Sequence, residues 1–146
     1  MNSNIKKTIV FAAIVSLLLL AGFTYYYYQL GPLDVKNANG KKMAAADLYE
    51  HFSKDSLSSK IAYLQKILEV RGTVSQVSQN QQNEVVVLLK TSQSAAAINC
   101  TLEEPIKNIK EGDIIAIKGV CSGMGESDRE LGIWGDVYLI RCYIVQ

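Results

Sequence analysis

The stretch Ile67–Val77, ILEVRGTVSQV, decides how this sequence folds. β-Branched residues are dense in it, and Leu68, Val70 and Val74 fall on one face at a spacing of two, which is typical of a strand. Gly72 interrupts that face, and a glycine inside a strand usually marks a bulge or the sharp bend where a small barrel coils. The stretch is therefore predicted to be the long first strand of a five-stranded barrel.

Four further strand patterns follow, separated by polar or glycine-rich turns. In chain order they are Glu84–Leu89, Ala95–Leu102, Asp113–Cys121 and Asp136–Gln146. The connection after the third strand, Glu103–Gly112, is expected to hold a single helical turn. Three strands, a short connection and two strands is the order of an OB-type Greek-key barrel, so the fold class is predicted to be mainly β.

Two short helices are predicted ahead of the barrel. Met43–Lys54 is alanine-rich, with an apolar side that includes Leu48 and Phe52. In the next segment Leu57, Ile61 and Leu64 recur at helical spacing, after a cap at Asp55 or Ser56. Both apolar stripes are expected to cover one end of the barrel and plug its core.

The N-terminal segment Thr8–Tyr28 carries no charge over 21 residues, which is the length of a helix that crosses a bilayer. Lys6 and Lys7 precede it, and the next basic residue is Lys36. By the positive-inside rule, residues 1–7 are predicted to be cytoplasmic and the C-terminal domain periplasmic, on a single-pass bacterial inner-membrane anchor. A cleaved secretory signal is the competing interpretation, although no A-x-A-like site follows the apolar run. Residues 29–42 are expected to be a linker and residues 43–146 the exported domain.

The charge balance of the exported part bears on its partners. From Lys41 onward the chain holds 12 Lys and Arg against 13 Asp and Glu. Nucleic-acid-binding domains normally carry a basic excess, because phosphate neutralisation supplies most of their affinity. The near-neutral balance therefore favours a protein or envelope partner, and it leaves room for a local basic patch.

The three cysteines would lie in an oxidising compartment, where disulfides persist. Cys121 and Cys142 are predicted to be too far apart along the last hairpin to bridge. Strands three and five are parallel neighbours in an OB barrel, so Cys100–Cys142 is the preferred disulfide. The alternative is that all three are buried core thiols.

The sequence predicts neither an enzyme nor a cofactor. His51 is the only histidine, and no C-x-x-C motif is present, so a metal site is not expected. No set of nucleophile, base and orienting group is apparent either.

OB domains bind ligands on the face of strands two and three and on the adjoining loops. The candidate ligand-binding residues here are Lys90, Asn99, Arg129 and Trp134. Trp134 would stack on a base or a sugar ring, or else pack over its own hairpin and close the end of the barrel. The acidic residues that surround Trp134 disfavour phosphate binding at that loop.

An ordered set of residues in this sequence resembles the tRNA_anti-like family, whose members are small bacterial OB-fold domains, often exported. The set spans about Met43 to Gln146 and reads Leu48-Tyr49, Phe52, Tyr63, Lys66-x-Leu68-x-Val70-x-Gly72-x-Val74, Gly112-Asp113, Lys118-Gly119-x-Cys121-x-Gly123 and Asp136-Val137-x-Leu139-x-x-Cys142. The loop Ser122–Gly135 is longer than is usual for the family. The resemblance implies nucleic-acid binding by fold analogy and brings no catalytic residues.

These observations predict a membrane-anchored, exported OB-fold binding module without enzymatic activity. Its ligand would be an oligonucleotide, as the family resemblance implies, or a protein or oligosaccharide. The alternative is a structural component of an envelope complex, held by its anchor and by lateral contacts with protein partners.

Overall fold

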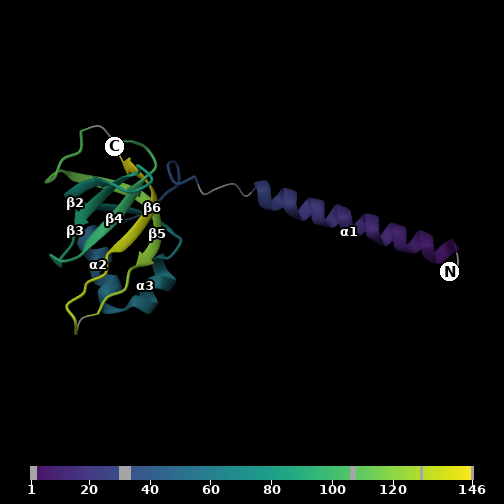
Figure 1. Ribbon diagram of the computed structural model, residues 1–146, viewed down its shortest axis with the longest axis horizontal. Coiled ribbons are helices and arrows are strands. Elements are labelled where there is room, and N and C mark those ends of the chain that lie inside the picture. The colour runs from purple at the N-terminus through teal and green to yellow at the C-terminus, as the bar shows by residue number, and fades with distance from the viewer. Residues whose placement is uncertain (1–2, 30–33, 106–107, 129, 146) are drawn as a thin grey trace. The chain divides into compact units, whose positions relative to one another are not determined.

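A computed structural model describes residues 3–29, 34–105, 108–128 and 130–145, with side chains at 12–26 and from residue 34 onward within those ranges. The chain divides into two compact units, Met1–Leu33 and Asp34–Gln146. The first holds helix α1 (Ser3–Gln29), and the second holds all the strands and two short helices (Figure 1).

Helix α1 confirms the helical conformation predicted for residues 8–28. Its side chains from 12 to 26 are all exposed, Leu17 and Leu19 among them at about 70%. Among the residues that the structure describes, no helix is long and apolar enough to cross a membrane. The transmembrane role of this segment therefore stays a prediction, and the side chains of Lys6, Lys7, Tyr27 and Tyr28 lie outside the described residues.

Five strands close into the predicted barrel. They are β2 (Ile67–Gln79), β3 (Val85–Lys90), β4 (Ala97–Leu102), β5 (Ile114–Met124) and β6 (Val137–Val145). β2 pairs with β3 and with β5, β3 pairs with β4, and β6 lies between β4 and β5. The β4–β6 pair is parallel and the other pairs of the ring are antiparallel, which confirms the OB-type order.

Strand β2 organises the barrel because it changes partners along its length. Residues 67–73 pair with β5, and residues 74–79 pair with β3 after a bulge between Val74 and Gln76. Gly72 lies at this change of partner. A Cβ atom on Gly72 would lie 2.9 Å from the Cβ of Ala45 and 3.2 Å from that of Leu89, so the glycine admits both neighbours. The bulge of β2 lies a few residues after Gly72, between Val74 and Gln76, and the glycine itself stands in regular pairing with β5.

The sequence did not predict strand β1 (Lys41–Ala44), which lies where a linker and the start of a helix were expected. β1 runs parallel to β2 and pairs Lys41 with Leu68 and Ala44 with Arg71. Helix α2 (Ala45–Lys54) follows directly and buries Ala45, with Leu48, Tyr49 and Phe52, in the barrel core. The described part of the connection after β4, residues 103–105 and 108–112, contains no helical turn.

The predicted packing of the second helix was wrong. Helix α3 (Ser56–Tyr63) turns Leu57 and Ile61 to solvent, where they are 76% and 79% exposed. It packs on the barrel through Ser59 and Tyr63 instead, which are 4% and 6% exposed. The helix therefore caps the barrel end without plugging it.

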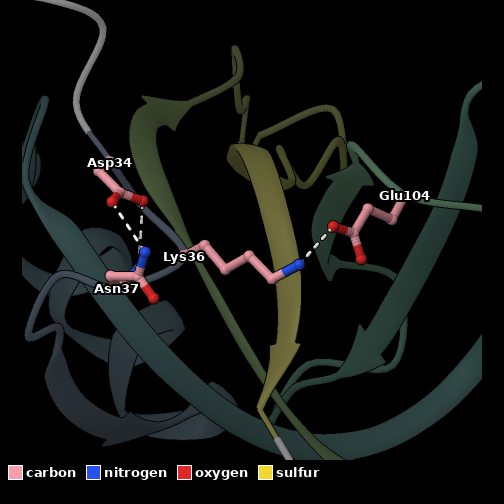
Figure 2. A network of polar contacts seen from close by, with 4 residues as sticks. All are labelled: Asp34, Lys36, Asn37 and Glu104. Atoms are coloured by element: carbon pink, nitrogen blue, oxygen red, sulfur yellow. Dashed lines mark hydrogen bonds and ion pairs between the residues drawn. The ribbon is translucent and has the colours of Figure 1, made fainter.

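The start of the second unit is fastened to the barrel, although the sequence predicted a linker over 29–42, of which 30–33 lie outside the described residues. Asp34 accepts hydrogen bonds from the backbone N and the Nδ2 of Asn37, at 3.3 and 2.9 Å (Figure 2). Val35 is buried. Lys36 reaches across β6 and donates to Glu104 over 2.6 Å, and this hydrogen bond raises the pKa of Lys36 (Figure 2). The chain thus enters the barrel at a fixed point.

Candidate binding face

The outer surface of β2, β3, β4 and β6 carries one row of side chains that the strand register aligns. Gln76 pairs with Leu88, Leu88 with Asn99, and Asn99 with Tyr138. Residues that pair directly across a sheet point to the same face, at Cβ separations of about 4.5–5.5 Å. Val87, Leu89 and Leu139, their neighbours along the strands, are buried, so the row faces outward. We call these four residues the outer row.

Tyr138 is the one aromatic side chain of the outer row and is 41% exposed. Its ring lies beside Gly125 in the β5–β6 loop, where a Cβ atom would approach Tyr138 Cε2 to 3.2 Å. The backbone of that loop is fixed in turn, because Gly125 N donates to Asp136 O over 2.9 Å. The glycine therefore gives the tyrosine ring a backbone to lie against while it leaves part of the ring open to a ligand.

A groove of about 670 Å³ continues the outer row toward the β3–β4 turn. It shares Gln76 and Leu88 with the row and is otherwise lined mostly by hydroxyl and amide side chains and by small residues, namely Ser75, Lys90, Thr91, Ser92, Gln93, Ser94, Ala95, Ala96, Ala97 and Asp136. Asp136 Oδ1 accepts a hydrogen bond from Ala97 N at 2.8 Å, which ties the start of β6 to the start of β4. The groove offers many neutral hydrogen-bonding groups.

The electrostatics of this face are close to neutral. Lys90 and Asp136 are the charged residues that line the groove, and they carry opposite signs. Arg141 on β6 lies 3.8 Å from Glu103, which offsets its charge. Recognition here would therefore rest on stacking and neutral hydrogen bonds more than on charge.

The model of the family described as tRNA_anti-like matches residues 1–131. The chain belongs to the tRNA_anti-like family. The match includes the N-terminal helix and ends at Leu131, so strand β6 with Tyr138 lies beyond it.

The other comparisons add little to this assignment. No curated protein matches the chain. Among solved structures it is similar to a putative aspartyl-tRNA synthetase from Leishmania major Friedlin, at 8% identity and a TM-score of 0.43. That similarity covers 80% of this chain and 23% of the synthetase chain.

The structure places the predicted binding residues of this tRNA_anti-like chain as follows. Lys90 pairs with Ala97 at the end of β3, and Asn99 lies two residues further along β4, so the two flank one part of the face. Trp134 is half-buried against the core, which is the packing role considered for it. Arg129 lies outside the described residues. The ligand-binding role of these residues stays a prediction.

Tyr138 was not among the binding residues predicted from the sequence. The signal was present in the alternation of the last strand, where Tyr138 stands between Val137 and Leu139. A spacing of two places those neighbours in the core and the tyrosine on the outer face.

All three cysteines are buried and carry free thiols in the structure. A hydrogen bond with Cys142, together with burial, raises the pKa of the Cys100 thiol well above its usual range. The two thiols of the predicted pair thus lie within hydrogen-bonding reach, and the disulfide stays a prediction.

Proposed function

We propose that this chain is a membrane-anchored binding module that holds a short single-stranded nucleic acid segment on its outer row. The observation that carries the proposal is the partly exposed Tyr138 ring, in register beside Asn99. Stacking of a base on an aromatic ring contributes about 1–3 kcal/mol and tolerates any base. Amide side chains such as Asn99 and Gln76 both donate and accept hydrogen bonds, as base edges do. Membership of the tRNA_anti-like family supports this class of ligand.

The near-neutral face sets the expected character of binding. With Lys90 as the cation of the groove, only one or two phosphates would be neutralised. Each contact contributes a slope of about 0.7 in log affinity against log salt for single strands. Binding is therefore weak, at dissociation constants of about 10⁻⁴ to 10⁻⁶ M, with a shallow but measurable salt dependence.

The test is fluorescence anisotropy of labelled single-stranded DNA and RNA oligonucleotides with the full chain in detergent. Tyr138→Ala should weaken binding about tenfold, because it removes the stacking surface. Ile114→Ala is the matched control, since Ile114 is 66% exposed at the far end of β5 from the outer row and should leave binding unchanged. Equal affinity in the two variants, or binding that ignores salt, would contradict the proposal.

Anchoring in the bacterial inner membrane, with the barrel in the periplasm, is part of the same proposal. It is supported by the uncharged run Thr8–Tyr28 and by the exposed apolar side chains of α1, which water would solvate poorly. A reporter enzyme that is active only outside the cytoplasm, fused after Gln146, should be active, and the fusion should resist alkaline extraction from membranes. An inactive fusion, or one that washes off, would overturn this part.

In that compartment Cys100 and Cys142 are proposed to form a disulfide. Their two thiols lose two protons and two electrons, which reduce the disulfide of an exported thiol–disulfide oxidoreductase to a dithiol. Chain purified without reductant and alkylated after denaturation should take one label, on Cys121, and three after reduction. Three labels before reduction would exclude the disulfide.

A further inference from the structure

Helix α3 presents its apolar stripe to solvent. Leu57 and Ile61 lie one turn apart and are 76% and 79% exposed, whereas Ser59 and Tyr63 on the opposite side contact the barrel. Lys60 lies beside this stripe and is also exposed. A short helix that buries a serine and exposes a leucine and an isoleucine has a surface suited to a partner.

A second apolar surface lies at the same end of the barrel, at the tip of the β5–β6 loop (Figure 1). Leu131 is 73% exposed there and Ile133 is 52% exposed. Asp128 and Ile133, on either side of the tip, exchange two backbone hydrogen bonds of 2.8 Å. Asp128 Oδ1 also accepts from Glu130 N and Leu131 N. A backbone hydrogen bond links the end of α3 to the strand that leads into this loop, because Gln65 N donates to Cys121 O of β5.

These two surfaces carry opposite charge. The helix side has Lys60 and Lys66 with one acidic residue, Asp55, and the loop sequence has Glu126, Asp128 and Glu130 with one basic residue, Arg129. Among the described residues, neither lysine and none of the three loop carboxylates forms an ion pair. The loop side is also hollowed into a cleft of about 440 Å³, lined by Glu126, Ser127, Asp128, Leu131 and Ile133. A cleft with two carboxylates and two apolar side chains fits a protruding helix that offers leucine, isoleucine and lysine.

We propose that the occupant of this cleft is helix α3 of a second copy of the chain. Ile61 and Leu57 of one copy contact Leu131 and Ile133 of the other, while Lys60 faces Glu126. Because both surfaces lie at one end of the same barrel, a two-fold axis lets each copy give its helix and receive its partner's at once. Each dimer thereby contains the contact between helix and cleft twice. Copies anchored in one membrane also meet at a raised effective concentration.

The proposal is tested by cysteine cross-linking of the full chain in detergent, between differently tagged copies. Ile61→Cys copies mixed with Leu131→Cys copies should give at least about tenfold more mixed disulfide dimer than Ile114→Cys copies mixed with Leu131→Cys copies. Ile114 is the matched control because it is an exposed apolar residue, 66% exposed, at the start of β5. The native cysteines are buried and do not compete in the folded chain. Dimers made through α1 would not favour the proposed pair over the control.

Charge reversal separates this docking from adventitious contact. Lys60→Glu should lower the cross-linking yield, and Glu126→Lys in the partner copy should restore it. Neither residue is buried, so both variants should fold. A yield equal to that of the Ile114 control, a failure of the restoring variant, or cross-linking of Ile61→Cys in native membranes to a different protein in preference to its own copy would overturn the proposal.

Discussion

Helices α2 and α3 are consecutive and short, and each carries an apolar stripe, yet they use the stripe in opposite ways. α2 buries Leu48 and Phe52 in the barrel, at 0% and 1% exposure. α3 exposes Leu57 and Ile61 and buries Ser59. The periodicity of a sequence therefore locates an apolar stripe on a helix but does not tell whether that stripe or the opposite side of the helix faces the core.

The difference has a structural cause in what lies under each helix. α2 begins over Gly72, whose missing side chain lets Ala45 approach β2 closely. At the end of α3, Leu64 packs near Gly123, and Gln65 and Lys66 are hydrogen-bonded to Cys121. These backbone hydrogen bonds fix the path of the chain from the end of α3 into β2. As a result the helix contacts the barrel only through the side that carries Ser59 and Tyr63.

The largest expected contrast comes from truncating one apolar residue of each helix. Phe52→Ala should lower the free energy of unfolding by about 3–5 kcal/mol, because it leaves a cavity in the core. At concentrations where the chain is monomeric, Ile61→Ala should change it by less than about 0.5 kcal/mol, since the side chain is exposed in the monomer and alanine favours a helix. Urea unfolding followed by circular dichroism measures both. Comparable losses would mean that α3 is buried against the same core.

A smaller effect is expected where α2 meets the barrel. Gly72→Ala should destabilise the domain by about 1–3 kcal/mol, because the new methyl group would lie 2.9 Å from Ala45 Cβ. Ala45→Gly in the same chain should recover part of that loss. If the double variant is no more stable than Gly72→Ala alone in urea, the close approach of α2 is not the reason for the glycine.

The smallest effect distinguishes the starts of the two helices by pH. Hydrogen bonds from the Oγ and N of Ser58 lower the pKa of Asp55, which caps α3, whereas Ala44 gives α2 no side-chain cap. Because folding lowers the pKa of Asp55, its ionised carboxylate stabilises the helix at pH values above its pKa in the unfolded chain, which is about 4. This stabilisation is lost as the pH falls through the pKa of Asp55 in the folded chain. The hydrogen-exchange protection of Ser58 N should therefore fall below about pH 4, while the first-turn amides of α2, which have no side-chain cap, should show no matching loss.

The control for this pH effect is Asp55→Asn, which keeps a capping oxygen but does not titrate. Its Ser58 protection should be independent of pH over the same range. An equal acid loss in this variant would show that Asp55 is not the titrating group.

Much of the barrel could be predicted because its signals are local. Alternation in Ile67–Val77 and the glycine inside it marked β2, and the order of the remaining strands followed from their turns. Strand β1 could not be predicted, since Lys41–Ala44 carries no alternation and becomes a strand only by pairing with β2. The direction in which the apolar stripe of α3 points depends on contacts distant in sequence, so it could not be predicted either.

The candidate site likewise has features that local sequence patterns predict and features that depend on contacts distant in sequence. Lys90 and Asn99 were expected on one face, and the register of β3 and β4 puts them there. Tyr138 was readable from its alternation with Val137 and Leu139. The position of Tyr138 beside Asn99 could not be predicted, because it depends on the register of the parallel β4–β6 pair, which no local pattern specifies.

The most direct test of the central claim is to locate a bound strand on the surface. A photoreactive single-stranded oligonucleotide would be cross-linked to the full chain, and the linked peptides identified by mass spectrometry. Links are expected at Tyr138 and its neighbours in the outer row, and none on α3. Links concentrated on Leu57, Ile61 or the β5–β6 tip, or no specific link at all, would contradict the central claim.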